Sequence, residues 1–325
     1  MARFGLNGLP SATHLSKRFS TSEAQALIAG LCSHAMLPLD AVVTAAFGLF
    51  LNVTAHVGGW PVVQGGSEKL IDAFVTALHA EGVTLHLDRP IRQLADLPRS
   101  RATLFDTSAN GLVDIAGERL NARFKSGVAK FQRGPGVFKV DWALSGPVPW
   151  TAPECRRTAT VHLGGTFEEI AAAEARVAAG QHPEAPYVLV TQPGVADPTR
   201  APAGCHTLWT YCHVPAGSTV DMTGRIEAQI ERFAPGFRDL ILARHTLTAA
   251  DEEMQNPNYV GGDINVGAGT LRQTIFGPAV RWNPYRTGAA GLYLCSASTP
   301  PGAGVHAMCG VGAAHAVLDD LHHCA

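Results

Sequence analysis

The sequence predicts a mixed α/β (α+β) fold in which a parallel, helix-flanked sheet is interrupted by an antiparallel one. Short apolar runs beside helical segments, such as residues 102–108, are typical of buried parallel strands. Between residues 135 and 250, apolar and polar residues alternate along several segments, as in antiparallel strands with one buried face. A chain of 325 residues is long enough to build both parts around ample cores.

The first 55 residues are expected to form helices. The serines and threonine at 20–22 can cap a helix through 23–31, and Pro38 can open the next one. The apolar stretch 41–55 is shorter than the roughly 20 residues that a membrane span needs. We interpret it as a buried helix, and contact with one face of a membrane is the alternative.

A well-marked amphipathic helix is predicted from Glu68 to about Ala80, with Ser67 as a plausible N-cap and Gly82 at its end. Two compact strands are expected to follow, at residues 83–87 and 102–108. The helix has an apolar stripe made of Leu70, Ile71, Phe74 and Leu78.

The middle of the chain reads as an antiparallel sheet with two amphipathic helices, at 167–179 and 225–233. Proline-rich turns separate its strands. The four strands that alternation predicts lie at residues 137–144, 158–163, 187–192 and 206–214.

The stretch "LYLCSASTPPGAGVHAMCG" (292–310) predicts a short strand, a stiff turn at Pro300 and Pro301, and a helix. Small residues at helical spacing would give that helix a face with little bulk. Either a large flat ligand approaches the backbone there, or the helix packs tightly on the sheet. The small residues are Ala303, Ala307, Gly310 and Ala314.

Several function classes have no visible motif here. The chain has no G-x-G-x-x-G, no G-x-x-x-x-G-K-[ST], no H-E-x-x-H and no G-x-S-x-G. The formal net charge is −2 and no basic run exceeds a pair, which argues against nucleic-acid binding. Asp141 is interpreted as a structural carboxylate rather than a catalytic one.

The seven cysteines are widely spaced, without any C-x-x-C, which predicts reduced thiols and a cytoplasmic location, with membrane association left open. We predict no metal site. The terminal "HHC" (322–324) could bind one, but a frayed tail is the preferred interpretation.

Four segments together resemble phytoene desaturase-like FAD-dependent (NAD(P)/FAD) oxidoreductases, and the resemblance runs over practically the entire chain. They are "GGWPVVQGGSEKLIDAFVTAL", "FQRGPGVFKVDWALSGPVPWT", "NPNYVGGDI" and "GLYLCSASTPPGAGVHAMCGVGAAHA". The resemblance implies the C-terminal remainder of a Rossmann-like FAD-binding domain with an inserted antiparallel-sheet substrate domain. By this division, residues 1–55 form the helical part of the substrate domain and 135–250 its sheet. Residues 56–134 and 251–325 belong to the FAD domain.

The same resemblance assigns cofactor and substrate contacts but no catalytic residue. The expected FAD contacts are Ile91, Asp106 and Thr107 toward the adenosine end, and Ser298, Gly302, Gly304, Val305 and His306 around the ring and its linking chain. The expected substrate contacts are Asn258, Gly261 and Gly262. His306 is the titratable candidate beside the ring, with a packing or flavin-contact role as the preferred interpretation. Ala303 and Ala307 stand where the family typically has glycine.

Relatives in that family begin with a strand and a glycine-rich turn that precede everything seen here. We therefore expect this chain to be truncated relative to them. The lead hypothesis is a desaturase or dehydrogenase that passes hydride between an apolar small-molecule substrate and FAD, which would carry the hard chemistry. The alternative is a non-catalytic remnant or subunit that binds no flavin without a separate N-terminal FAD-binding segment. Peripheral membrane contact is a third expectation.

Overall fold

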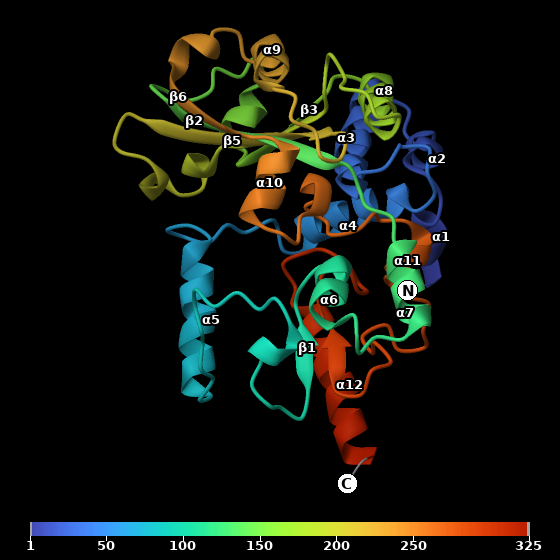
Figure 1. Cartoon of the computed structure of the whole chain (residues 1–325). Coiled ribbons are helices and arrows are strands. Elements are labelled where there is room, and N and C mark those ends of the chain that lie inside the picture. The colour runs from blue at the N-terminus through green and yellow to red at the C-terminus, as the bar shows by residue number, and fades with distance from the viewer. Residues whose placement is uncertain (1, 324–325) are drawn as a thin grey trace. The chain divides into compact units, whose positions relative to one another are not determined.

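The computed structural model describes residues 2–323, with side chains from residue 4 to 322. Cys324, a member of the candidate metal-binding tail, lies outside the described residues. The chain divides into two compact units (Figure 1). The first comprises Met1–Asp88, Val137–Pro215 and Thr219–Thr248, and the second comprises Arg89–Gly136, Ala216–Ser218 and Ala249–Ala325.

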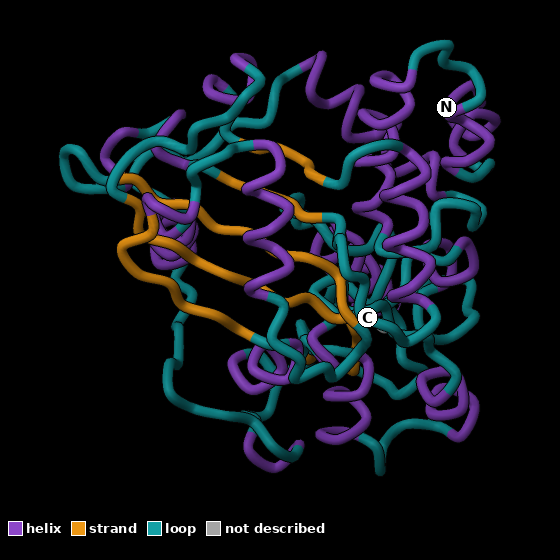
Figure 2. Tube along the Cα trace, turned by 90° about the horizontal axis from the view of Figure 1, so that it is seen from above, coloured by secondary structure: helices purple, strands orange, loops and turns teal. Residues whose placement is uncertain are grey.

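The first unit contains a five-stranded sheet in the order β3-β4-β5-β2-β6, and its strands run side by side in Figure 2. Alternation predicted four of these strands, and the structure confirms them. The fifth, β6, is a largely exposed edge strand that the sequence analysis missed. The strands are β2 (Gly136–Leu144), β3 (Thr160–Leu163), β4 (Val188–Thr191), β5 (His206–Val214) and β6 (Ile241–Leu247).

Two helices of the first unit begin and pack much as their sequences predict. Helix α8 (Phe167–Ala178) opens with a reciprocal capping box between Thr166 and Glu169. Helix α9 (Thr223–Phe233) buries its isoleucines completely, and Phe237 beyond it meets Trp142 of β2 edge-on at 5.7 Å. The even-numbered residues of β2 therefore face this apolar layer.

The chain begins with a group of helices, of which α2, α3 and α4 share a core with α8. They are α1 (Ala2–Gly8), α2 (Ala12–Ser16), α3 (Ser22–Cys32), η1 (Ser33–Ala35) and α4 (Thr44–Val57). Helix α4 was expected to be buried, and that prediction is wrong for one of its faces. Gly48 packs so closely on Cys32 that a Cβ would collide with its sulfur, whereas Phe50 and Val57 are 59% and 84% exposed.

Helix α5 (Glu68–Ala80) forms as predicted, yet it buries none of its residues. Residues 83–87 do not form the expected strand. A strand needs a neighbour to pair its N–H and C=O groups, and the described part of the chain offers none at that place. Residues 56–88 also cluster with the first unit instead of the second, and Gly65 N–H donates to Asp197 Oδ2 at 2.7 Å there.

The second unit is built on two parallel strands, β1 (Thr103–Phe105) and β7 (Leu292–Leu294), which confirms strands at both predicted places. Phe105, Leu112, Phe124 and Leu294 are among the residues of its apolar core. The helices of this unit are α6 (Ala109–Ala116), α7 (Ala122–Ala129), α10 (Ala249–Gln255), α11 (Leu271–Phe276) and α12 (Met308–His323).

The predicted small-residue face of the last helix is wrong. Helix α12 begins at Met308, so Ala303 and Ala307 precede it, and Ala307 has a φ of 55°, outside the helical region. The buried positions of α12 instead include Cys309, Ala313 and Ala316, which lie on one face because they are four and three residues apart. Since the helix starts about one turn late, residues 302–307 form a loop.

Short 3-10 turns complete the connections. In the first unit they are η3 (Pro153–Arg157), η4 (Pro193–Val195), η5 (Pro198–Arg200) and η6 (Arg238–Leu240). In the second they are η2 (Leu94–Asp96) and η7 (Val260–Gly262).

Candidate functional site

The candidate site lies at the carboxyl end of the two parallel strands of the second unit. Phe105 pairs with Leu294, and the N–H of Cys295 donates to the carbonyl of Phe105 at 2.9 Å. Because the strands run in the same direction, the segments after them leave at one edge of the sheet. That edge is where open α/β sheets place their ligands.

Ser298 connects three segments at this edge. Its hydroxyl is buried, accepts the N–H of Ala109 at 3.3 Å and donates to the carbonyl of Val266 at 3.0 Å. The neighbouring Ser108 caps α6 by accepting the N–H of Gly111 at 3.1 Å. The turn after β1, the start of α6 and the loop after β7 are therefore fixed to one another.

Asn258 brings the "NPNYVGGDI" loop to the same place. Its Oδ1 accepts the N–H of Ser108 at 2.8 Å, directly after Asp106 and Thr107 at the end of β1. Asp106 is exposed, and Thr107 is partly buried. The structure thus gathers Asp106, Thr107, Asn258 and Ser298, which lie far apart in the sequence.

The paired glycines of this loop have a geometric role. Gly261 and Gly262 both adopt left-handed φ values, 71° and 78°, and both are buried. A Cβ on Gly262 would lie 2.6 Å from the Cβ of Ala249, and one on Gly136 would lie 2.6 Å from the carbonyl oxygen of Gly261. These glycines let three backbone segments approach closely, which positions Asn258.

Asp263 is a site residue that the sequence analysis missed. It is 1% exposed and accepts the N–H groups of Gly134 at 2.7 Å, Asn265 at 3.0 Å and Gly267 at 2.9 Å. Burial raises the pKa of its carboxyl, and these three donors oppose that rise. An acidic residue directly after two glycines was the signal that could have marked it.

The loop 302–307 carries the remaining predicted ring contacts. Gly302 and Gly304 have φ values of 103° and 150°, and Val305 is 95% exposed. The N–H of Met308 donates to Nδ1 of exposed His306 at 3.0 Å, so Nε2 carries the hydrogen of the neutral imidazole. This loop therefore presents backbone, an apolar side chain and one imidazole N–H to solvent.

Ile91 is the predicted contact that the structure does not join to the others. It is partly buried in a turn where Asp96 accepts the N–H groups of Arg92 and Gln93. No hydrogen bond among the described residues links this turn to the end of β1. The prediction for Ile91 rests on the resemblance alone.

The thiol of Cys295 responds to this environment. Burial raises its pKa to about 11, with further contributions from the charges of Asp106 and Cys309. The charge of Asp106, directly after β1, thus helps to raise the pKa of Cys295, directly after β7.

The gathered segments leave almost no internal space. The cleft between Ser108, Phe131, Asn258 and Ser298 has a volume of about 10 Å³, around the minimum for one water molecule. A ligand larger than a water molecule therefore has no room inside this cleft. Among residues 2–323, no group of three metal-ligating side chains is placed to hold a metal ion. The described helices likewise include none that is long and apolar enough to cross a membrane.

Similarity to known proteins is significant in sequence and in fold. The chain is 28% identical over 302 residues to "Pyridine nucleotide-disulfide oxidoreductase domain-containing protein 2" of Rattus norvegicus, a match that covers 81% of this chain and 52% of the relative. It is 28% identical over 130 residues to "4,4'-diapolycopen-4-al dehydrogenase" of Metabacillus indicus, covering 38% of this chain and 26% of that protein. This chain spans about half the length of the rat relative. No protein-family model matches it.

Solved structures share the fold. An oxidoreductase from Methanosarcina mazei aligns with a TM-score of 0.60 at 17% identity, covering 96% of this chain and 68% of that one. A redesigned putrescine oxidase aligns with a TM-score of 0.59 at 14% identity, covering 99% and 69%. The predicted mixed α/β fold class is confirmed, because the chain shares its fold with these two solved structures.

Proposed function

We propose that this chain is part of an FAD-dependent oxidoreductase, and that the edge formed by Asp106, Thr107, Ser298 and the loop 302–307 contacts the flavin. The observation that carries the proposal is the convergence of these residues at the carboxyl end of β1 and β7. The sequence similarity to two oxidoreductases supports it. The similar folds of solved oxidoreductases agree with it.

The residues present fit the ring end of a flavin. A Cβ on Gly302 would meet no heavy atom within 4 Å, so a flat ligand has room beside the backbone. The left-handed φ values of Gly302 and Gly304 are tolerated by glycine and disfavoured by other residues. The bound flavin would supply a two-electron acceptor for hydride. His306 would offer its Nε2–H to an electron-rich edge of the ring, and Asn258 and Asp263 would keep the surrounding loops in place.

The finer proposal is a phytoene desaturase-like dehydrogenase acting on an apolar substrate. Its support is the resemblance carried by "NPNYVGGDI" and the terminal motif, together with the partial match to the Metabacillus indicus dehydrogenase. We assign Asn258 to the border between flavin and substrate. Gly261 and Gly262 would act there through the shape they give the loop.

The test is a titration of the purified chain with FAD, riboflavin and ADP, followed by flavin fluorescence and calorimetry. Riboflavin has the ring without the adenosine half, and ADP has the adenosine half alone. Contacts at the ring end predict saturable binding of FAD and riboflavin with dissociation constants within about tenfold of each other, and weaker binding of ADP. Binding of ADP but not of riboflavin would contradict the assignment of residues 302–306.

A second candidate is a subunit that needs a separate FAD-binding segment, and α5 favours it. Ile71 and Phe74 are 58% and 54% exposed on a helix that buries nothing, and Leu87 in the adjoining unpaired segment is 83% exposed. Unpartnered apolar faces of this kind mark interaction surfaces. We propose that such a segment covers them and pairs with residues 83–87.

Co-expression with the part of the rat relative that this chain does not match tests the subunit proposal. Co-purification that is lost with Ile71→Ser and Phe74→Ser, but kept with Leu27→Ser at an exposed position of α3, would support it. Retention of the segment by the double variant would reject α5 as the contact. Peripheral membrane contact is proposed for α4, where Phe50 and Val57 are exposed, and co-sedimentation with lipid vesicles checks it.

A further inference from the structure

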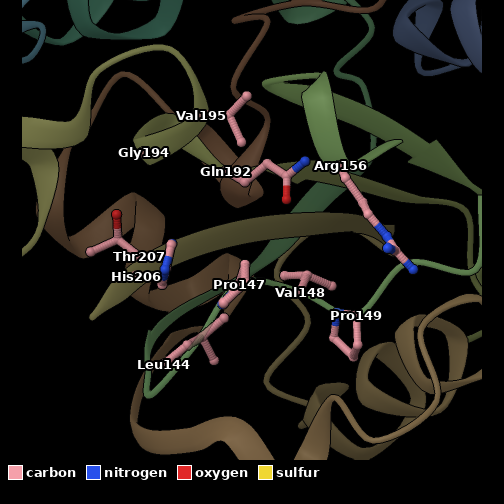
Figure 3. A pocket seen from close by; sticks show the side chains of 10 residues that line it. All are labelled: Leu144, Pro147, Val148, Pro149, Arg156, Gln192, Gly194, Val195, His206 and Thr207. Atoms are coloured by element: carbon pink, nitrogen blue, oxygen red, sulfur yellow. The ribbon is translucent and has the colours of Figure 1, made fainter. Parts of the chain in front are cut away.

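A cavity of about 520 Å³ lies in the sheet of the first unit (Figure 3). Its walls come from the end of β2, the loop that follows it, the turn η4 and the start of β5. All of its lining residues belong to the first unit, whereas the proposed flavin contacts belong to the second. A volume of this size lies within the range of small-molecule sites in proteins.

Most of the wall is apolar. Leu144 and Val148 are buried at 0% and 5% exposure, and Pro147, Pro149 and Val195 extend the apolar surface around them. A hydrocarbon chain placed here would leave water, which is favourable in proportion to its buried area. The body of the ligand is therefore aliphatic.

The polar groups that line the cavity differ in whether they already have hydrogen-bond partners. Gln192 is satisfied, because its Oε1 accepts from Trp150 Nε1 and its Nε2 donates to the carbonyls of Cys155 and Thr158. The hydroxyl oxygen of Thr207 is buried and has no hydrogen-bond partner among the described residues. The accessible surface of this oxygen is below 1 Å², so a molecule in the cavity does not reach it. Neither Gln192 nor Thr207 therefore offers a hydrogen bond to a ligand.

Arg156 supplies the charge. Its Nε and Nη2 donate to the carbonyl of Trp150 at 2.9 and 2.7 Å, which holds the guanidinium in place. A guanidinium has five N–H donors, so others stay available. No carboxylate of the described chain lies within 4.0 Å of the Arg156 guanidinium. By contrast, four other arginines each form an ion pair with a carboxylate: Arg225, Arg232, Arg244 and Arg286. The available partner is an anion from outside, and a carboxylate matches the planar fork.

Figure 3 shows Arg156 on one side of the cavity and His206 with Thr207 on the other, with Pro147 and Val148 between them. We propose that this cavity binds an aliphatic carboxylate. The carboxylate binds Arg156, and the hydrocarbon lies along Pro147, Pro149 and Val195. The site is independent of the proposed flavin contacts.

Isothermal titration calorimetry with decanoate and decanol tests the assignment on the purified chain. Decanoate is expected to bind more tightly than decanol. Arg156→Ala should weaken decanoate at least about tenfold and leave decanol within about twofold, because it removes a charge-assisted contact. Arg157→Ala, the same change one residue away at a position outside the lining, should leave both unchanged.

A blocking variant locates the site. Val195 lines the cavity and is 43% exposed, so Val195→Phe should fill space without disturbing the fold and should weaken both ligands at least about tenfold. Val62→Phe, at a position that is 48% exposed and outside the lining, is the matched control and should have no effect. Unchanged binding in Val195→Phe, or equal loss of decanol and decanoate in Arg156→Ala, would overturn the proposal. Failure of decanoate to bind the wild-type chain would overturn it as well.

Discussion

The side-chain oxygen of Asn258 accepts the backbone N–H of Ser108 at 2.8 Å, across 150 positions of sequence. This bond ties the loop before η7 to the turn after β1. Without it, a partly buried amide would lose its partner, which costs about 1–3 kcal/mol.

Replacing Asn258 tests that bond. Asn258→Ala removes the acceptor, whereas Asn258→Asp keeps an oxygen at the same position. We expect exchange of the Ser108 amide, followed by hydrogen-exchange mass spectrometry, to speed up at least about tenfold in Asn258→Ala and far less in Asn258→Asp. Equal exchange in wild type and Asn258→Ala would mean that the contact does not hold the turn.

Gly262→Ala tests the close approach of backbone segments. The new Cβ would lie 2.6 Å from Ala249 and would require an unfavourable φ of 78°, so we expect a local loss of about 2 kcal/mol or more. Gly291→Ala has a similar φ of 76°, but its nearest neighbour is the Arg101 oxygen at 3.3 Å, and it should cost about 1 kcal/mol. Hydrogen exchange of residues 259–267 measures the difference, and equal protection in both variants would contradict the packing argument.

Acid should destabilise the first unit through a partly buried histidine pair. His34 Nε2 and His162 Nε2 lie 2.9 Å apart, and burial lowers their pKa values to about 3 and about 4 from 6.5. Between pH 6.5 and the lowered pKa values, the folded state therefore binds fewer protons than the unfolded state. The contribution of the pair to the free energy of unfolding is fully present above pH 6.5. It falls as the pH drops toward 4, by up to about 1.4 kcal/mol per pH unit for each histidine.

The measurement is urea unfolding at several pH values, followed by tryptophan fluorescence in a Trp282→Phe background. That exposed residue is the tryptophan of the second unit, so the remaining signal reports on the first. His162→Gln should flatten the pH dependence, and His56→Gln, at an exposed position, should not. An unchanged slope in His162→Gln would show that this pair does not control the acid response.

Cys295 should react slowly for a partly exposed thiol. Its pKa is raised to about 11 by burial and then by the charge of Asp106, so little thiolate is present at pH 8. Asp106→Asn lowers that pKa, and we expect iodoacetamide labelling of Cys295 to rise about twofold to fivefold. Peptide mass spectrometry measures the rate. Asp114→Asn, an exposed carboxylate on α6, is the control, and an equal rise there would indicate a general effect of charge.

The sequence predicted elements whose pattern alone determines them. Alternation located β2 and β5, because parts of each strand bury every second residue, and the apolar run of β4 marked a strand that is buried on both faces. The apolar stripe of α5 predicted a helix, but it did not predict that the stripe would be exposed. A sequence pattern indicates that a helix face can pack against a partner, but it does not show whether that partner is present. For the same reason residues 83–87 have strand composition without a strand.

The site was predicted in part. The family resemblance predicted that Asn258 and Ser298 lie near the same ligand. The hydrogen bonds of the two side chains show how the structure holds them in place. Asp263 was missed because its three backbone partners come from a distant segment and a loop, a relationship that no local pattern contains. The start of α12 was misplaced because glycine and alanine spacing fits a helix and a loop equally well.

The most direct test of the flavin assignment compares two variants after incubation with excess FAD and gel filtration. Val305→Asp places a charge on the 95% exposed position of the loop, and Val280→Asp makes the same change at a 44% exposed position of the second unit outside it. We expect a flavin absorbance band with wild type and Val280→Asp, and its loss with Val305→Asp. Equal FAD retention by both variants, or none by the wild-type chain even when the complementary segment is supplied, would contradict it.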